Sequence, residues 1–312
     1  MSDTAIVVED LHKHFGDVVA LDGVSFAAPS GTVFCLLGPN GAGKTTAVRI
    51  LTTILRPDRG RAAVLGIDVV GEPQPVRTVI GLAGQYAAVD ENLTGRENLR
   101  MMGRLTHLAR PETHRRADEL LERFGLADAG DRTLRTYSGG MRRRLDLAAA
   151  LVHRPPVLFL DEPTSGLDPR SRQDLWGVIE ELVAEGTTVL LTTQYLEEAD
   201  HLAHAIAVVD CGRVIAEGSP ADLKARLGTT ILEVGLADRE AASRAGALLA
   251  PLGVLSTDEP GTTVSLQVVS GPAAIMAAVR ALDGASIEPT LLAVREPTLN
   301  DVFLRLTGHA AE

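Results

Sequence analysis

The segment Gly38-Pro39-Asn40-Gly41-Ala42-Gly43-Lys44-Thr45 constrains the fold of this chain more than any other part of its sequence. It fits the pattern G-x-x-x-x-G-K-[ST] and follows the apolar run Val33–Leu37, which is typical of a buried strand. The glycines allow backbone N–H groups to converge on phosphate oxygens, and a helix from residue 44 to about residue 55 directs its positive end there. Lys44 is expected to neutralise the β- and γ-phosphates of a nucleotide, and Thr45 to ligate Mg²⁺. A chance glycine turn is disfavoured, because strand, loop and helix occur in the required order.

Two carboxylates follow a second apolar run, residues 157–160, and they are the candidate catalytic groups. A buried strand over this run places Asp161 at its carboxyl end, where the side chain can hold Mg²⁺ through water. Glu162 is then in position to orient and deprotonate an attacking water molecule. An acidic pair after a strand is weak on its own, because many loops begin with acids. Together with the phosphate loop it predicts an NTPase.

The segment Tyr137-Ser138-Gly139-Gly140-Met141 decides which kind of NTPase is predicted. Locally it is a serine N-cap followed by two glycines that open a helix. A capped helix start without side chains is also an anion site, although the chain already has one phosphate loop. A second γ-phosphate contact makes sense if this segment faces the nucleotide of another subunit.

These residues resemble the ABC ATPase family, whose signature is usually written Leu-Ser-Gly-Gly-Gln. The chain departs from that signature at Tyr137 and Met141, whereas the central Ser-Gly-Gly, which makes the phosphate contact, is intact. The resemblance covers roughly residues 5–225. It implies ATP and Mg²⁺ as cofactors, and a homodimer in which Ser138, Gly139 and Gly140 of one subunit contact the nucleotide of the other.

The resemblance also implies roles for residues outside these motifs. Gln85 is similar to the glutamine that links Mg²⁺ and the attacking water to a membrane partner, which gives it catalytic, nucleotide-binding and metal-binding roles. Asp168 ends a segment, residues 165–168, that is similar to the loop meeting its counterpart across the dimer. Phe15 has the place of the ring that stacks on adenine, with a core position as the alternative. The implied nucleotide site is Phe15, Gly38, Asn40, Gly41, Gly43, Lys44, Thr45, Thr46, Gln85, Ser138, Gly139, Gly140 and Asp168, and the implied metal site is Thr45, Gln85 and Asp161.

Gln194 marks a narrower resemblance. The family usually has a histidine at this place, in contact with the γ-phosphate, whereas the amide of Gln194 can donate a hydrogen bond but carries no titratable proton. We therefore expect Glu162 to remain the general base and Gln194 to act as a positioning donor. Residues 85–99, 192–200 and 296–303 are similar to the ATP-binding subunits of daunorubicin-resistance exporters. This similarity implies efflux of a drug, antibiotic or lipid-like molecule through a separate integral membrane permease. The similarity also implies two copies of each subunit and a peripheral position at the cytoplasmic face of the membrane.

Strand-like runs alternate with helix-like stretches along the chain, which predicts an α/β fold with a parallel sheet covered by helices. The strand-like runs are residues 6–8, 33–37, 157–160, 188–192 and 206–209. Charged helical stretches dominate residues 93–154, so we interpret them as a helical insertion in a P-loop NTPase core over residues 1–228. Residues 229–312 are predicted to form a small α+β domain, with signals in the order βαββαβ of the ferredoxin-like pattern and the last strand over residues 287–294. No catalytic motif occurs there, so a dimer-stabilising or regulatory role is favoured over a small-molecule sensor.

The composition excludes some classes of protein. A net charge of −11 argues against a nucleic-acid partner, and the one basic run, residues 142–144, is interpreted as a solvated helix face. No apolar run reaches the roughly 18–20 residues of a membrane span, and the first residues do not resemble a secretory signal. Two cysteines without metal-ligand spacing fit a reduced, cytosolic protein.

Three other functions fit part of the sequence. A soluble ABC ATPase acting on ribosomes or DNA usually carries two cassettes, a long coiled coil or zinc modules, and the sequence indicates none of them. An importer ATPase would work with a binding protein outside the cell, whereas the small second domain and Gln194 favour export by resemblance. A kinase or GTPase would share the phosphate loop but would leave residues 137–141 unexplained.

Overall fold

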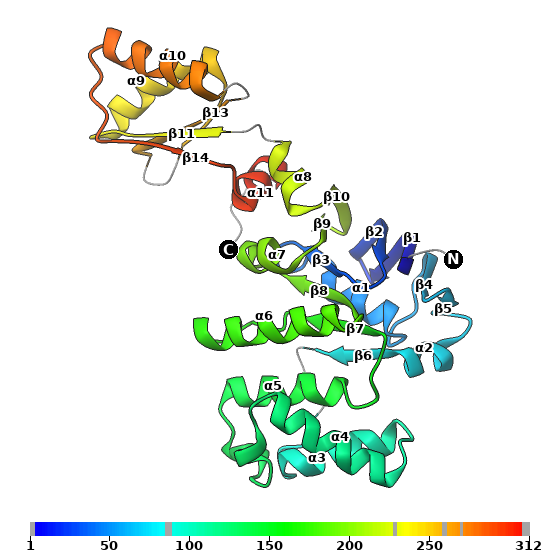
Figure 1. The fold of residues 1–312 in the computed structure, drawn as a ribbon. Coiled ribbons are helices and arrows are strands. Elements are labelled where there is room, and N and C mark those ends of the chain that lie inside the picture. The colour runs from blue at the N-terminus through cyan, green and yellow to red at the C-terminus, as the bar shows by residue number, and fades with distance from the viewer. Residues whose placement is uncertain (1–3, 85–88, 227–229, 258–260, 269–270, 308–312) are drawn as a thin grey trace. The chain divides into compact units, whose positions relative to one another are not determined.

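The computed structural model describes residues 4–84, 89–226, 230–257, 261–268 and 271–307, which divide into two compact units (Figure 1). The first unit reaches Ser219, and the second begins at Pro220. Gln85, a predicted site residue, lies outside the described residues. Within the described ranges, no helix is long and apolar enough to cross a membrane.

A six-stranded sheet forms the centre of the first unit, with the strand order β10-β9-β3-β8-β7-β6. The strands from β9 to β6 are parallel, and β10 pairs antiparallel with β9 at one edge. All side chains of β3, β7 and β8 are buried, as expected for strands covered on both faces. The strands predicted in this sheet are confirmed as β3 (Val33–Leu37), β7 (Val157–Asp161), β8 (Thr188–Thr193) and β9 (Ala205–Asp210), and β6 (Ile80–Ala83) and β10 (Arg213–Gly218) complete it.

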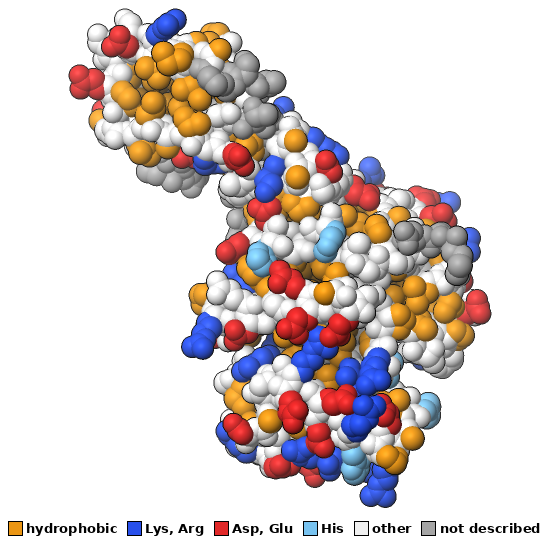
Figure 2. Space-filling view, in the orientation of Figure 1, with side chains coloured by type: hydrophobic (Ala, Val, Ile, Leu, Met, Phe, Trp, Pro, Cys, Tyr) orange, Lys and Arg blue, Asp and Glu red, His pale blue; other side chains and the backbone are white. Residues whose placement is uncertain are grey.

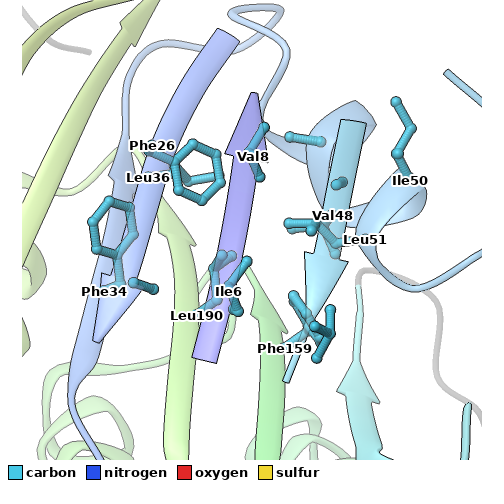
Figure 3. Packing of buried hydrophobic residues seen from close by; sticks show 14 of the residues in the cluster. Ile6, Val8, Phe26, Phe34, Leu36, Val48, Ile50, Leu51, Phe159 and Leu190 are labelled. Carbon is cyan, nitrogen blue, oxygen red and sulfur yellow. The ribbon is translucent and has the colours of Figure 1, made fainter. Parts of the chain in front are cut away.

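A second, antiparallel sheet has the order β2-β1-β4-β5. Helix α1 (Lys44–Leu51) contacts β2 and β4 of this sheet and β7 of the parallel sheet. Apolar side chains from both sheets and α1 form one core (Figure 3), in which the rings of Phe26 and Phe34 stack with centroids 5.1 Å apart. The sequence indicated only residues 6–8 as a strand here, because register shifts between β1 and β2 interrupt the alternation of buried and exposed positions. The elements are β1 (Thr4–Phe15), β2 (Val18–Pro29), β4 (Arg59–Val64) and β5 (Ile67–Asp68), followed by α2 (Pro73–Val79).

Helices α3 (Gly95–Leu105), α4 (Arg110–Arg123) and α5 (Gly139–Ala150) lie within the segment predicted as a helical insertion. Helix α3 packs against α4 and α5, and α5 contacts β6. Basic and acidic side chains are interspersed over this part of the surface, toward the bottom of Figure 2, and form ion pairs such as those of Arg115 with Glu112 and Glu119. On the rest of the unit, α6 (Pro169–Ala184) and α7 (Leu196–Leu202) pack against each other and against β8.

The second unit is built on one antiparallel sheet with the order β12-β13-β11-β14. Its elements from β11 to β14 occur in the order βαββαβ, as expected, although the last strand begins at Leu291 rather than at residue 287, because Ile287 packs into the core ahead of it. One face of the sheet packs against α9 and α10, and on the other face Arg295 bridges Glu233 and Asp301. The elements are α8 (Pro220–Ala225), β11 (Thr230–Gly235), α9 (Arg239–Leu249), β12 (Val254–Thr257), β13 (Thr263–Val268), α10 (Gly271–Gly284), β14 (Leu291–Arg295) and α11 (Leu299–Thr307).

Candidate nucleotide-binding and hydrolysis site

The phosphate loop between β3 and α1 depends on close backbone approaches that only glycine permits. A Cβ at Gly38 would lie 2.1 Å from the carbonyl oxygen of Val209. Gly43 has φ +104°, and a Cβ there would lie 2.4 Å from the carbonyl oxygen of Ala20. The first N–H groups of α1 receive no side-chain cap, so they are free to bind an anion. The cleft beside them, of about 310 Å³, brings together the predicted residues Asn40, Gly41, Gly43, Lys44, Thr45, Thr46 and Glu162.

Lys44 is a buried cation within this loop. Its side chain is 3% exposed, and Nζ donates to the carbonyl oxygens of Gly38 (2.6 Å) and Pro39 (2.9 Å). Nζ also lies 3.6 Å from Oε1 of Glu162. Burial lowers the pKa of Lys44, and the nearby Glu162 carboxylate opposes this shift. The loop therefore holds a positive charge at the point where nucleotide phosphates are expected.

Asp161 accepts two hydroxyl hydrogen bonds at one oxygen. Thr45 Oγ1 donates to Asp161 Oδ1 at 3.1 Å, and Thr192 Oγ1 donates to the same atom at 2.6 Å. A hydroxyl beside a carboxylate is a set of hard oxygen donors that fits Mg²⁺, which normally takes its remaining ligands from phosphate and water. No group of three or more His, Cys, Asp or Glu side chains in the described residues could hold a metal ion by itself.

Glu162 has an unusual backbone conformation. Its φ is +50°, in the left-handed region that an L-residue adopts at a cost of about 1–2 kcal/mol. Its N–H donates to both the carbonyl oxygen and Oγ1 of Thr192, each at 3.1 Å. Its carboxylate is 10% exposed and lines the phosphate-loop cleft beside Lys44. Glu162 also lines a second cleft, of about 320 Å³, with Gly139 and residues 165–167.

The signature segment forms the predicted helix cap. Ser138 is the N-cap of α5, and its hydroxyl accepts a hydrogen bond from the N–H of Met141 (3.3 Å). Tyr137 is buried and donates from its hydroxyl to the carbonyl oxygen of Ala129 (2.7 Å), so this departure from the usual signature has a structural role. A Cβ at Gly139 would have no atom within 4 Å. Neither Ser138 nor the two glycines line the phosphate-loop cleft of their own chain.

Phe15, Asp168 and Gln194 also lie outside the phosphate-loop cleft. Phe15 is 47% exposed, with Lys13 Nζ 5.6 Å from the centre of its ring, so the core alternative for Phe15 is wrong. Asp168 is the N-cap of α6, and hydrogen bonds from Ser171 lower the pKa of its carboxyl. Gln194 is half-buried between β8 and α7.

Comparison with known proteins assigns this site to a family. Residues 21–165 match the family model for ABC transporters, and residues 218–307 match that for the C-terminal domain of DrrA1-3-like ATP-binding proteins. The daunorubicin resistance ATP-binding protein DrrA3 of Streptomyces coeruleorubidus is 56% identical over 99% of this chain and 97% of its own length. The chain belongs to the ATP-binding proteins of ABC transporters.

Other relatives of this ABC ATP-binding protein are also named as ATP-binding proteins of resistance or export systems. The daunorubicin/doxorubicin resistance ATP-binding protein DrrA of Streptomyces peucetius is 51% identical over 99% of the chain and 94% of its own length. A Nod factor export ATP-binding protein of Ralstonia nicotianae is 38% identical over 98% of the chain and 95% of its own length. The solved ATP-binding subunit of an ABC transporter, 28% identical, superposes with a TM-score of 0.65 over 71% of this chain and 92% of its own. The predicted P-loop NTPase core is confirmed, and the activity is that of an exporter ATPase subunit, which couples ATP hydrolysis to transport with a membrane partner.

Two residues of this ABC ATPase site were not singled out from the sequence. Thr192 holds both Asp161 and Glu162, but a threonine at the end of a strand carries no motif of its own. Arg143 was interpreted as part of a solvated helix face, and that interpretation is wrong, because its side chain is only 15% exposed and lies against the backbone after β7. All residues from 145 to 150 are buried, so α5 has no buried face that recurs with helical spacing. The pattern therefore could not show which of the three arginines, residues 142–144, is buried.

Glu198 is a buried carboxyl at the start of α7, beyond Gln194. It is 0% exposed and accepts a hydrogen bond from Trp176 Nε1 at 3.2 Å. Burial raises the pKa of Glu198, and the nearby hydroxyls of Thr193 and Thr164 and the hydrogen bond from Trp176 oppose the shift. Its folded-state pKa is therefore above the unfolded value, so the ionised form of Glu198 destabilises the folded chain.

Replacing Glu198 with glutamine should stabilise the chain increasingly as the pH rises. The wild type loses stability as the pH rises from the unfolded pKa through the raised folded pKa, whereas the neutral amide does not titrate. Thermal unfolding at pH 5 and pH 7.5 should give a larger Tm advantage for the variant at pH 7.5, with about 2–4 °C for each kcal/mol. Glu197→Gln, at a neighbouring carboxylate that is 77% exposed, is the control and should give no such trend. An advantage that is constant or falls with pH would contradict the assignment.

Proposed function

We propose that this chain binds Mg-ATP at its phosphate loop and hydrolyses it with Glu162 as the general base. The observation that carries this is the buried cluster in which Lys44 lies 3.6 Å from Glu162 while Thr45 and Thr192 both donate to Asp161. Lys44 neutralises the β- and γ-phosphates, and the amides at the start of α1 hold their oxygens. Mg²⁺, held by Thr45 and Asp161 and by Gln85, withdraws charge from the phosphate oxygens when it is bound.

In the hydrolytic step, Glu162 accepts a proton from water as the water oxygen attacks the γ-phosphorus. The new bond is between water oxygen and phosphorus, the bond between phosphorus and the ADP oxygen breaks, and the electron pair leaves with ADP. Gln194 donates a hydrogen bond to the γ-phosphate and holds it for attack. Its amide does not titrate, so it acts as a donor and leaves the role of base to Glu162. Phe15, which is exposed, is free to stack on the adenine ring.

We infer that the active form is a homodimer with two nucleotides at its interface. Ser138, Gly139 and Gly140 form an open helix start, yet they do not line the phosphate-loop cleft of their own chain. A two-fold partner would supply them to the γ-phosphate, because the two surfaces of a closed dimer complement each other. Asp168 would end the loop, residues 165–168, that meets its counterpart across this interface.

The second unit contains no residue of the nucleotide cleft, and we propose that it has the ferredoxin-like fold and stabilises or regulates the dimer. Residues 218–307 match the model for the C-terminal domain of a family of ATP-binding proteins, so this domain accompanies the motor in those relatives. The proposed boundary, with residues 1–228 in the motor and 229–312 in the appendage, falls after α8, whereas the second compact unit begins before α8, at Pro220.

We propose a drug, antibiotic or lipid-like molecule as the exported substrate. The relatives named for daunorubicin resistance and for Nod factor export, which span nearly the whole chain, support this. Two copies of the chain would bind two integral membrane permease subunits at the cytoplasmic face of the membrane, through the surface near Gln85 and the helical insertion. The permease would select the substrate, and no nucleic acid takes part.

Glu162→Gln should bind ATP, fail to hydrolyse it and accumulate as a dimer. Without the base the γ-phosphate is retained, so the two nucleotides continue to hold the subunits together. Light scattering with gel filtration in Mg-ATP should give twice the monomer mass for the variant, and ADP should return it to monomer. An ATP-bound monomer would be inconsistent with the proposed dimer. A Glu162→Gln chain ending at residue 228 tests the second unit, whose dimer-stabilising role predicts a weaker ATP-induced dimer.

The positioning role of Gln194 predicts different effects for two substitutions. Gln194→Ala removes the hydrogen bond and should lower kcat by about tenfold or more, whereas Gln194→His retains a donor and should keep turnover within a few-fold of wild type. The measurement is steady-state ATP hydrolysis with Glu197→Gln as an exposed control on the neighbouring helix. If Gln194→Ala has wild-type turnover, Gln194 is not a positioning donor.

The membrane partner is testable by gentle solubilisation of membranes from cells that express a tagged chain. We expect a multi-span membrane protein to co-purify in equal amount, because the relatives that span nearly the whole chain are named as resistance and export ATP-binding proteins and an exporter needs a membrane-spanning subunit. Cells should then resist the exported compound only when both proteins are present and Lys44 is intact. A pool bound to ribosomes, or to nothing, would refute the exporter assembly while leaving the ATP chemistry unaffected.

A further inference from the structure

Arg143 makes an unusual set of contacts for a residue on a helix surface. Its Nε donates to the carbonyl oxygen of Pro163 at 2.7 Å. One terminal nitrogen donates to the carbonyl oxygens of Asp161 (3.1 Å) and Glu162 (2.9 Å), and the other donates to that of Gly84 (2.5 Å). A single side chain therefore binds three consecutive carbonyl groups after β7 and a fourth at the end of β6.

Only a guanidinium can satisfy this arrangement. Its five N–H groups lie in one rigid plane, whereas lysine has one nitrogen and glutamine has two donor hydrogens. Hydrogen bonds from a charged donor are shorter and stronger than neutral ones, and the Asp146 carboxylate, 3.7 Å from Arg143, balances the charge. Removing the guanidinium would take the charged donor from the carbonyl oxygens of residues 161–163, and that of Glu162 would keep only the longer bond from the N–H of Ser165 (3.3 Å).

These bonds act on the residue whose backbone is strained. Glu162, with φ +50°, is held at its N–H by the two hydrogen bonds to Thr192 and at its carbonyl oxygen by Arg143 (2.9 Å) and by the N–H of Ser165 (3.3 Å). A left-handed L-residue persists only when its surroundings hold it in that conformation. Of the two donors to the Glu162 carbonyl oxygen, Arg143 is the charged and closer one, and it also holds the peptide groups of Asp161 and Pro163, so the direction of the Glu162 side chain depends on Arg143.

Arg143 also connects this strained residue with two other functional segments. It lies on α5, five residues after Ser138, the cap of the signature helix. Its bond to Gly84 reaches the residue that directly precedes Gln85. The same side chain thus ties the start of the signature helix to the ends of β6 and β7 within one subunit.

We propose that Arg143 is a positioning residue for ATP hydrolysis, which holds the backbone of Glu162 so that its carboxylate faces the attacking water. The proposal rests on the proposed role of Glu162 as general base. Arg143 touches neither nucleotide nor water in this role; it acts only through the peptide groups of residues 161–163. Its loss should therefore reduce the rate of the chemical step and leave nucleotide binding intact.

The test is ATP hydrolysis by Arg143→Gln and Arg143→Lys in a preparation in which the wild-type full-length chain turns over ATP. We expect Arg143→Gln to lower kcat by about tenfold or more while KM for ATP changes by less than about twofold, because a displacement near 1 Å is enough to slow chemistry a hundredfold. Arg143→Lys should be intermediate, since it keeps the charge and some of the donors. Arg144→Gln is the matched control: it lies on the same helix, donates to the carbonyl oxygen of Phe124 (3.2 Å) rather than to residues 161–163, and should retain wild-type kcat.

A double-mutant comparison separates positioning of Glu162 from a general structural effect. In single turnovers on a Glu162→Gln background, Arg143→Gln should cause less than about a twofold further loss, because no base remains to be positioned. An equal loss on both backgrounds, or a rise in KM with kcat unchanged, would overturn the proposal, as would wild-type kinetics in both Arg143 variants. If Glu162→Gln itself retains wild-type turnover, the proposed base is wrong, and that outcome is distinct from failure at Arg143.

Discussion

One oxygen of the Asp161 carboxylate joins the elements on which the nucleotide site depends. It accepts hydrogen bonds from Thr45 at the start of α1 and from Thr192 on β8, so a helix and two neighbouring strands meet at a single atom. Asp161 is 4% exposed, and a charge buried to that extent is stable only with hydrogen bonds or a cation to compensate it. Because its charge must be compensated, the Asp161 carboxylate is also suited to bind a divalent cation. Parallel pairing of β3, β7 and β8 supplies the geometry, because their carboxyl ends lie at one edge of the sheet.

Local sequence was sufficient to predict the parts of the site that lie in continuous motifs. Val33–Leu37 and the phosphate loop after it are fixed by a short pattern with a known backbone requirement, and the steric contacts at Gly38 and Gly43 explain why that pattern is needed. The predicted strand before Asp161 is confirmed because a fully buried strand reads as an uninterrupted apolar run. The element order of the second unit was predictable for a similar reason, since each helix and strand there has a clear period.

Contacts between segments distant in sequence could not be predicted in this way. The antiparallel sheet of the first unit was largely missed, because bulges between β1 and β2 shift the alternation of side chains that sequence analysis relies on. Arg143 and Glu198 are charged residues that composition places on the surface, and only the fold reveals the carbonyl oxygens and the Trp176 ring nitrogen that they contact. Charged residues are buried only with partners, and those partners are 19 and 22 residues away in the sequence.

The two units have separate apolar cores, and this affects how the stability of the chain can be measured. The core around Phe34 and Leu190 and the core around Leu232 and Leu249 have no residue in common among those described. The sequence contains one tryptophan, Trp176, and it lies on α6 in the first unit. Intrinsic tryptophan fluorescence will therefore follow the melting of the motor alone, whereas circular dichroism averages over both units. Transitions that fail to coincide between these two probes are what two independent cores produce, and they need no folding intermediate to explain them.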